Sequence, residues 1–324
     1  MKKGLIILVL MLIGLHLDTA IAQYDIKNVE KDRLAKAKVK SQVEFTHDYK
    51  DGKPVEQGYK SAVRKYDTKG NITEEVNHNA AGKIISVIIY QYDNKSNQVN
   101  YERYQGNREK LQYSQKIVYD ANSNKTREYG YDGAMSYSNT YTYNNAGKLS
   151  EIIYTTNNNI VEKRKLTYSG NKTEIQIFTG NTLSFNQVNT YNAKGNLLSE
   201  IKTDHNGKQV YALTYEYKND AILSVETKKR GDILEYQKYY QYDSENRPVK
   251  EETSNLDGAK FVSHEYKYNN TGCLEEEKWK KNQHSKEVSS KKIDYDAKGI
   301  QSEVESYFAT YKLYSLYKFT YEYY

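Results

Sequence analysis

Apolar and polar side chains alternate along most of the chain. Aromatic or β-branched residues occupy every second position, as in the Tyr-x-Tyr segments at 90–92, 141–143 and 266–268. A period of two places alternate side chains on one face of an extended strand, whereas a helix needs a period near 3.6. The pattern therefore predicts β-strands with one buried face.

A tyrosine followed by Asp or Asn recurs along the chain, and we call it the anchor. Successive anchors lie 23 to 27 residues apart, which gives about ten units of about 25 residues. So narrow a spacing over so many copies indicates a tandem repeat of one small structural unit. The anchors are Tyr66, Tyr92, Tyr119, Tyr143, Tyr191, Tyr242, Tyr268 and Tyr295, with weaker copies at Tyr168 and Tyr217, which Ser169 and Lys218 follow.

The residues after the anchor predict a tight hairpin turn. An Asp or Asn, two free positions and a Gly suit a type I turn followed by a left-handed residue, because the Asx side chain caps the turn and glycine accepts a positive φ. Where glycine is absent, Asn246 suits the same conformation, whereas Ser96 and Ser123 predict less regular tips. The predicted structural turn residues are Asp67, Gly70, Asn144, Gly147, Asn192, Gly195, Asn269, Gly272, Asp296 and Gly299.

A second turn follows many anchors after thirteen residues, for example at 79–82 and 204–207. Each repeat therefore contains two strands and two turns. We predict an all-β fold, an elongated twisted ribbon or solenoid-like array of tandem antiparallel β-hairpins with two strands per repeat of about 25 residues. About ten such YD-type β-hairpin repeats occupy residues 61–305.

The ends of the chain differ from the repeats. A basic start, a short apolar run and small residues predict a signal peptide over 1–22, with cleavage between Ala22 and Gln23. Residues 23–60 predict an N-terminal cap with a short helix and a first hairpin, and 306–324 an aromatic C-terminal capping hairpin. We expect a secreted, periplasmic or cell-surface protein, not lipid-anchored and without a stable membrane span after cleavage.

Composition narrows the function classes. The chain has 48 Lys and Arg against 42 Asp and Glu, a mild excess with both signs interspersed, which argues against a nucleic-acid surface. Its 35 tyrosines against 6 Phe and 1 Trp supply much of the apolar area. Cys273 is the one cysteine of the sequence, so no intramolecular disulfide contributes to stability.

The tyrosine stripes are the strongest candidate for a binding surface. Rings repeated on one face of a sheet offer rigid, amphipathic area for a sugar ring or a peptide strand. The alternative is that they pack on one another as the core of a thin sheet. The candidate ligand-binding residues are Tyr90, Tyr92, Tyr141, Tyr143, Tyr215, Tyr217, Tyr240, Tyr242, Tyr266 and Tyr268.

No other group of residues indicates catalysis. We interpret a glutamate nine residues after many anchors as a solvent-facing row paired with cross-strand lysines. The histidines show no metal-ligand spacing, and Cys273 has no partner histidine in the sequence pattern. We predict no enzyme activity, no catalytic residues, no metal and no cofactor. The glutamates of this row are Glu75, Glu128, Glu200, Glu226, Glu251 and Glu277, with Glu151 and Glu303 one place earlier in their repeats.

The motif Tyr-Asp-x-x-Gly-Asn-Leu, seen at 66–72, 143–149 and 191–197, resembles the YD repeats of the RHS-like family. The resemblance covers about 60–305. It implies β-hairpin ribbons, which in the largest members spiral into shells around a toxin; smaller secreted members are described as repeat or carbohydrate-binding proteins. This chain is shorter than the shells, and it carries neither their Asp-Pro-x-Gly-Arg self-cleavage motif nor a toxin-like domain after the repeats.

These observations leave two functions open. The first is a non-enzymatic repeat scaffold for protein interaction at the cell envelope, with an envelope or extracellular protein as partner. The second is a carbohydrate-binding YD-repeat protein that contacts a glycan through exposed tyrosine stripes. A fragment of a toxin-shell system is the weakest alternative. Exposed tyrosines beside polar side chains would indicate a glycan, whereas an apolar patch or an open strand edge would indicate a protein partner.

Overall fold

A computed structural model describes residues 26–256 and 258–324 as one helix and a long series of strands. The helix is α1 (Ile26–Lys36). The strands of the first half are β1 (Val39–His47), β2 (Tyr49–Lys50), β3 (Lys53–Pro54), β4 (Tyr59–Tyr66), β5 (Ile72–His78), β6 (Ile84–Tyr92), β7 (Gln98–Gln105), β8 (Lys110–Tyr119), β9 (Lys125–Tyr131), β10 (Ser136–Tyr143), β11 (Leu149–Thr156) and β12 (Asn159–Ser169).

The second half continues the same series without another helix among its described residues. Its strands are β13 (Lys172–Thr179), β14 (Thr182–Tyr191), β15 (Leu197–Asp204), β16 (Gln209–Lys218), β17 (Ile222–Arg230), β18 (Ile233–Tyr242), β19 (Pro248–Ser254), β20 (Lys260–Tyr268), β21 (Leu274–Trp279), β22 (Ser289–Tyr295), β23 (Gln301–Phe308) and β24 (Leu313–Tyr323). The predicted signal peptide over 1–22 and its cleavage site at Ala22 and Gln23 lie outside the described residues.

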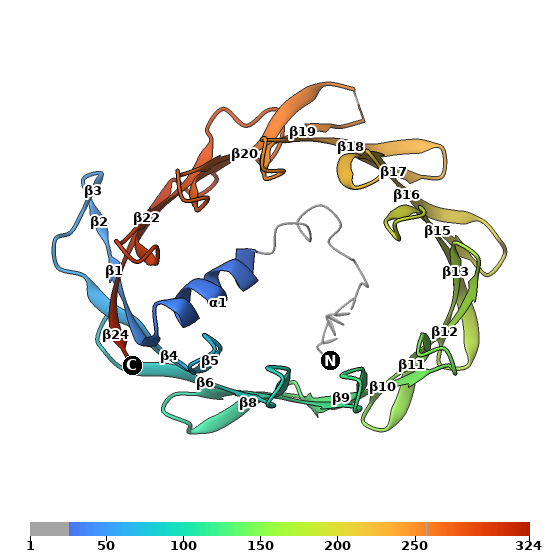
Figure 1. Ribbon diagram of the computed structural model, residues 1–324, viewed down its shortest axis with the longest axis horizontal. Coiled ribbons are helices and arrows are strands. Elements are labelled where there is room, and N and C mark those ends of the chain that lie inside the picture. Colours follow the sequence, from blue (N-terminus) through green and yellow to red (C-terminus); the bar gives the residue numbers. More distant parts are fainter. Residues whose placement is uncertain (1–25, 257) are drawn as a thin grey trace, which may run out of the picture.

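The strands form a closed antiparallel barrel of 22 strands (Figure 1), so the predicted open ribbon or solenoid-like array is wrong. Strands β4 to β24 pair with their neighbours in chain order, as tandem hairpins do. The ring closes because β1 pairs with β24 on one side and with β4 on the other. A twisted and coiled sheet of this length brings its two ends together, and closure leaves no barrel strand with an unpaired edge.

Each repeat is a hairpin whose turn follows the anchor tyrosine. In the first one Asp67 Oδ1 accepts hydrogen bonds from the backbone amides of Lys69 and Asn71, at 2.9 Å each. Gly70 has φ +76°, the left-handed conformation that the turn requires. Tyr66 then pairs with Ile72, but Lys65 pairs with Glu74, so one residue is left over in a β-bulge.

The remaining predicted turn glycines also have positive φ, between 72° and 83° for Gly147, Gly195, Gly272 and Gly299. Ser96 and Ser123 adopt the same conformation, each with φ 66°, and Asn246 has φ 59°. The amide of Ser96 donates to the carbonyl of Asp93 at 3.1 Å, as the Gly70 amide does to Asp67 at 3.0 Å. The expectation that the serine tips are less regular is therefore wrong, because the Asx cap holds the turn without glycine.

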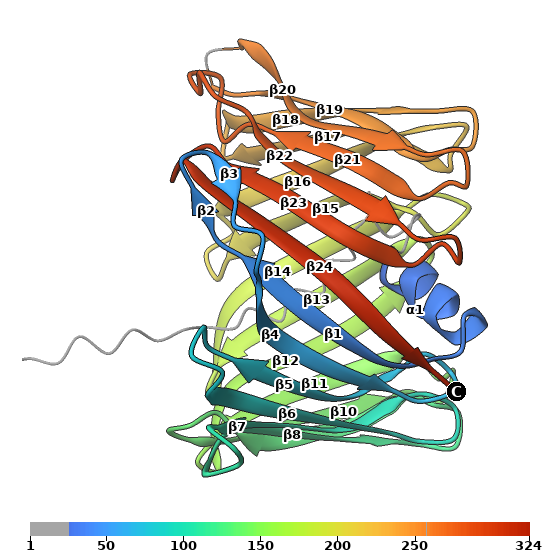
Figure 2. The same ribbon diagram turned by 90° about the vertical axis from the view of Figure 1, so that its left-hand side faces the viewer.

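Helix α1 lies inside the ring of strands, close to the rim formed by the anchor turns (Figures 1 and 2). Its Leu34 packs against Val39, Tyr66 and Ile300 in one buried cluster. A Cβ added to Gly70 would lie 2.3 Å from the carbonyl oxygen of Lys31. The absent side chain of this turn glycine thus lets the helix backbone approach the rim.

The short hairpin of β2 and β3 lies outside the barrel wall (Figure 1). Its Tyr49 stacks on Tyr314 of β24, with ring centroids 5.2 Å apart, and donates a hydrogen bond to Glu305 Oε1 at 2.7 Å. The aromatic segment 306–324 forms the end of β23 and all of β24, and the outer edge of β24 is paired with β1.

Candidate functional site

The tyrosine-rich face of the sheet lines the interior of the barrel, which we call the lumen. Because α1 lies inside the ring and its Leu34 contacts Tyr66, the face of β4 that carries Tyr66 points inward. Strand alternation and the pairing registers carry this face from strand to strand, for example from Arg64 to Glu75 and then to Ile88. All ten predicted ligand-binding tyrosines are on the luminal face.

Most anchor tyrosines have a structural role in this lumen. The hydroxyl of Tyr143 donates to the backbone carbonyl of Lys125 at 2.8 Å, and that of Tyr217 donates to Leu197 at 2.8 Å. The acceptor follows the preceding anchor by six residues, at the bulge of the neighbouring hairpin. Each bond therefore connects two repeats, and we call it the anchor clamp. The same clamp is formed by Tyr119, Tyr168, Tyr268, Tyr295 and, on β24, Tyr321.

The anchor clamp explains why these positions carry tyrosine. A phenylalanine would bury the same ring but would leave the bulge carbonyl without its donor. The sequence pattern shows the anchors but not this bond. Among the predicted residues, Tyr242 differs because its buried hydroxyl has no hydrogen-bond partner.

Four other tyrosines form a continuous line across the lumen wall, which we call the luminal aromatic row. Tyr90 on β6 meets Tyr101 on β7 edge to face at 5.2 Å, and Tyr101 meets Tyr113 on β8 at 5.5 Å. Tyr113 and Tyr137 on β10 stack at 6.2 Å and share a hydrogen bond of 2.9 Å between their hydroxyls. All four rings are half-buried, so part of each ring remains accessible.

Gly130 on the intervening strand β9 makes the last contact of the luminal aromatic row possible. Tyr137 pairs with Gly130, and Gly130 pairs with Gln115, so β9 separates Tyr113 from Tyr137. A Cβ at Gly130 would lie 1.8 Å from the carbonyl oxygen of Ser114. The glycine thus permits a close approach of β9 to β8, across which the two rings meet.

The glutamates nine residues after the anchors also face the lumen, so their interpretation as a solvent-facing row is wrong. Glu226 accepts hydrogen bonds from the hydroxyls of Tyr236 at 2.6 Å and Tyr240 at 3.2 Å. Glu128 accepts one from Gln115 Nε2 at 2.9 Å and pairs with Lys125 at 2.9 Å. We call these residues, which also include Glu75, Glu200, Glu251 and Glu277, the carboxylate row.

The β-bulge accounts for this correction. Without the extra residue after Ile72, Glu74 would lie opposite Arg64; with it, Glu75 takes that place. A shift of one residue moves a side chain to the other face of the sheet. The two exceptions fit the same rule: Glu151 pairs with Lys165 and Glu303 with Lys318 on the outer face.

The surroundings of two luminal groups, Glu251 and Tyr90, shift their pKa values in opposite directions. Burial opposes ionisation of Glu251, but contacts from His264, Lys238 at 3.4 Å and Ser263 at 2.9 Å lower its pKa to about 2. Burial raises the pKa of Tyr90 to about 12. At neutral pH the lumen therefore offers the ionised Glu251 as an acceptor and the protonated Tyr90 hydroxyl as a donor.

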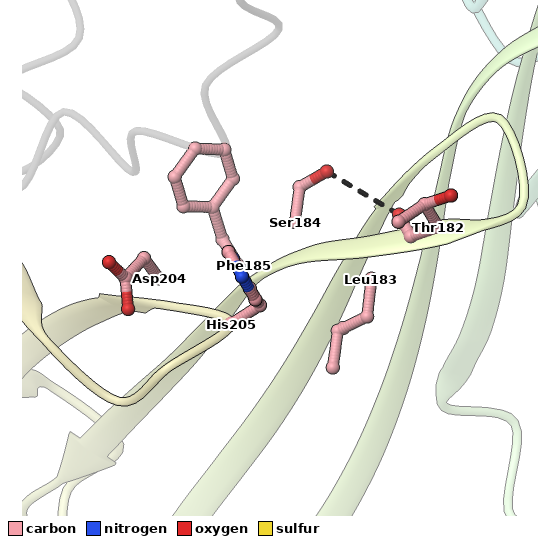
Figure 3. Close-up of a pocket in the computed structure, with 6 residues that line it drawn as sticks. All are labelled: Thr182, Leu183, Ser184, Phe185, Asp204 and His205. Carbon is pink, nitrogen blue, oxygen red and sulfur yellow. Dashed lines mark hydrogen bonds between the residues drawn. The ribbon is translucent and has the colours of Figure 1, made fainter.

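A shallow hollow of about 390 Å³ opens beside the first residues of β14 and the turn that follows β15 (Figure 3). It is lined by Thr182, Leu183, Ser184, Phe185, Asp204 and His205. The ammonium of Lys202 lies 4.2 Å from the centre of the Phe185 ring. Burial lowers the pKa of Lys202. The lysine covers one face of this ring, so we place the candidate site at the luminal aromatic row instead.

No group of three or more His, Cys, Asp or Glu side chains within 26–256 and 258–324 is arranged to hold a metal ion. Cys273 is buried, with its Sγ 3.3 Å from the Thr271 hydroxyl. In the described part of the chain, no helix has the length and apolar character needed to cross a bilayer.

Comparisons with known proteins give the following likenesses. A protein-family model described as "Uncharacterised protein" matches residues 140–231, and a search of curated proteins found no match. The crystal structure of TcdB2-TccC3-Cdc42 is 12% identical with a TM-score of 0.44, covering 79% of this chain and 14% of that chain. The Photorhabdus luminescens Tc holotoxin pore is 11% identical with a TM-score of 0.29, covering 86% and 18%.

A porin-like protein from Bacteroides uniformis is 10% identical with a TM-score of 0.30, covering 88% of this chain and 98% of that chain. The structural neighbours thus include toxin-complex and porin-like proteins, and the matching family model is not that of the YD repeats. This chain spans about one seventh of the length of the TcdB2-TccC3 chain that it matches.

Proposed function

We propose that this chain is an exported, non-enzymatic carbohydrate-binding barrel of YD-type repeats, which holds a segment of polysaccharide in its lumen. The observation that supports the proposal is the luminal aromatic row of Tyr90, Tyr101, Tyr113 and Tyr137 beside buried carboxylates and amides. A sugar ring has an apolar face that packs on aromatic side chains and hydroxyls that need fixed donors and acceptors. The lumen wall supplies both.

The carboxylate row makes the lumen suited to hydroxyl-bearing ligands. Glu128 and Glu75 lie opposite Ile117 and Arg64, on the strands that carry or flank the luminal aromatic row. Ionised carboxylates accept stronger hydrogen bonds than neutral groups do. Burial raises the pKa of Tyr90, Tyr101 and Tyr137, so their protonated hydroxyls supply donors on the same luminal face.

The same features speak against a scaffold for protein interaction as the first choice. Such a scaffold needs an open strand edge or a large apolar patch, whereas every strand of the barrel is paired on both sides. The tyrosines line a concave surface, which suits a narrow ligand better than a folded domain.

The proposal is tested by measuring binding of the purified chain to a panel of soluble polysaccharides, with tyrosine fluorescence as the readout. We expect saturable quenching with at least one polymer. Tyr101→Ala removes the ring at the centre of the luminal aromatic row and should weaken that binding at least tenfold, about 1.4 kcal/mol. Tyr129→Ala is the matched control, because this ring lies on the outer face of β9 under Arg127.

Equal loss of binding in both variants would contradict a luminal site. Binding of a protein from envelope extract by the outer face, with no response to any polysaccharide, would overturn the proposal in favour of a protein-interaction scaffold.

A further inference from the structure

The connection between β21 and β22 interrupts the regular repeat. It spans residues 280–288, where most other hairpins of the barrel have short turns; the connection over 48–58 is longer and carries the β2–β3 hairpin. Hydrogen bonds define its shape: the amide of Lys280 donates to the carbonyl of Ser263 at 3.0 Å, and the amide of His284 donates to Asn282 Oδ1 at 3.0 Å. The segment is therefore a loop with a defined conformation, and the repeat motif does not predict it.

This loop meets the turn between β23 and β24 at one rim of the barrel. The amide of Ala309 in that turn donates to the hydroxyl of Ser289, the first residue of β22, at 3.0 Å. A hollow of about 260 Å³ lies between the two segments. We call it the lysine pocket, and it is lined by Lys281, Ser285, Lys286, Glu287, Ser289, Ala309, Thr310 and Lys312.

The lysine pocket carries an excess of positive charge. Its three lysines are exposed, and none of them takes part in an ion pair within the described residues. The single carboxylate, Glu287, accepts a hydrogen bond from the Tyr307 hydroxyl at 2.6 Å, which raises the pKa of Tyr307 to about 12. Three ammonium groups, two serines and a threonine around one hollow are donors suited to an anion.

Exposed apolar side chains flank the lysine pocket. Tyr311 is 79% exposed, and Leu313 in the same turn region is 55% exposed. An aromatic ring beside ammonium groups matches a ligand that combines an apolar ring face with a negative charge. A sugar acid has both features, whereas an inorganic anion has no apolar face that could pack on the ring.

The place of the lysine pocket relates it to the lumen. Helix α1 lies near the rim of the anchor turns, whereas the β23–β24 turn belongs to the opposite rim (Figure 2). A polymer that enters the lumen from the side opposite α1 crosses this rim. We infer that the lysine pocket binds the carboxylates of an acidic polysaccharide, and that the chain therefore favours uronate-type polymers over neutral ones. This inference rests on the proposed function and adds the charge of the ligand.

The test compares three probes with the purified chain: polygalacturonate, neutral dextran and poly-glutamate. The variant K281Q/K286Q/K312Q removes the three charges without changing the size of the side chains much. The control K83Q/K110Q/K208Q removes three exposed lysines from other turns of the same rim. Circular dichroism establishes that each variant retains its strands.

We expect polygalacturonate to bind the wild-type chain more tightly than dextran, with an affinity that falls as salt rises. The lysine-pocket variant should bind polygalacturonate roughly tenfold more weakly at low salt and lose most of the salt dependence, while the control variant keeps both. Equal affinities in the two triple variants would overturn the inference. Tight binding of poly-glutamate in place of polygalacturonate would reassign the lysine pocket to an acidic protein.

The two proposals fail separately. Tyr101→Ala should reduce binding of both neutral and acidic polysaccharides, whereas the lysine-pocket variant should reduce only that of the acidic one. If a neutral polymer binds through Tyr101 and acid groups on the polymer do not increase the affinity, the inference about the lysine pocket is wrong and the proposed function stands. If no polysaccharide binds the wild-type chain, the proposed function fails as well.

Discussion

Two sectors of the lumen wall consist of the same kind of antiparallel hairpins but carry different side chains. On β12 and β13, Leu166, Ile175 and Ile177 form a buried aliphatic cluster with exposures of 8% or less. On β6 to β10, the corresponding surface is the half-buried luminal aromatic row. The aliphatic cluster has no donor or acceptor to offer a ligand and contributes to stability. The aromatic row keeps accessible ring faces and hydroxyls, so the proposed recognition surface and the stabilising cluster occupy different sectors of one ring.

The largest effect should come from the aliphatic cluster. Ile175→Ala removes a side chain that is 5% exposed and should lower the free energy of unfolding by about 3 kcal/mol. Polysaccharide binding at a temperature where the variant is folded should not change. Urea unfolding followed by circular dichroism measures the first quantity and fluorescence titration the second. A loss of binding with little loss of stability would show that the two sectors are not separate.

A smaller effect is expected at the glycine beneath the aromatic row. Gly130→Ala should cost about 2 kcal/mol, because β9 must move away from the Ser114 carbonyl, and it should separate Tyr113 from Tyr137. Binding should therefore weaken together with stability. Gly147→Ala is the control, since its Cβ meets nothing within 4 Å and only its φ of +72° is strained. Unchanged binding in Gly130→Ala would exclude the Tyr113 and Tyr137 contact from the site.

Removing one anchor clamp should have a still smaller effect. Tyr217→Phe deletes the hydroxyl that donates to the Leu197 carbonyl and should cost about 1 kcal/mol in urea unfolding. Tyr101→Phe in the aromatic row, where the ring contacts carry the packing, should cost less. Equal costs in the two variants would contradict the division between structural anchors and the tyrosines proposed to bind a ligand.

The last prediction concerns Glu251 and the pH dependence of stability in acid. The folded-state pKa of about 2 is below the ordinary 4.5, so the unfolded chain binds the proton more readily between these values. The stabilisation is present above about pH 4.5 and is lost as the pH falls towards 2. Glu251→Gln should flatten this part of the stability curve. If the variant and the wild type lose the same free energy of unfolding in acid, Lys238 and His264 do not stabilise the ionised form of Glu251.

Local features of the fold were predictable from the sequence, but closure was not. Asp67 and Gly70 specify a turn through short-range chemistry, so strand and turn positions follow from the spacing of such pairs. The pairing of β1 with β24 joins residues at opposite ends of the chain, such as Val43 and Thr320. No local sequence pattern predicts that contact, because it depends on the twist and coiling summed over all intervening hairpins.

The candidate site could be predicted from the sequence only in part, for a similar reason. Tyr90 belongs to the repeat motif and was identified, whereas Tyr101, Tyr113 and Tyr137 lie outside it. Gly130 inside a strand was an available signal, since glycine there marks a close backbone approach. The inward direction of Glu75 depends on the extra bulge residue, which a type I turn followed by a left-handed residue already implies.

The position of β1 also determines how the protein must fold. Ser41 Oγ donates to Glu322 across a sequence separation of 281 residues, while most other strand pairs join neighbours in the chain. Closing a loop of that length costs about 5 kcal/mol of chain entropy before any contact forms. Refolding should therefore be slow and limited by this one seam. Until it forms, β1 and β24 expose unpaired edges, so ring closure is the step at which aggregation competes with folding.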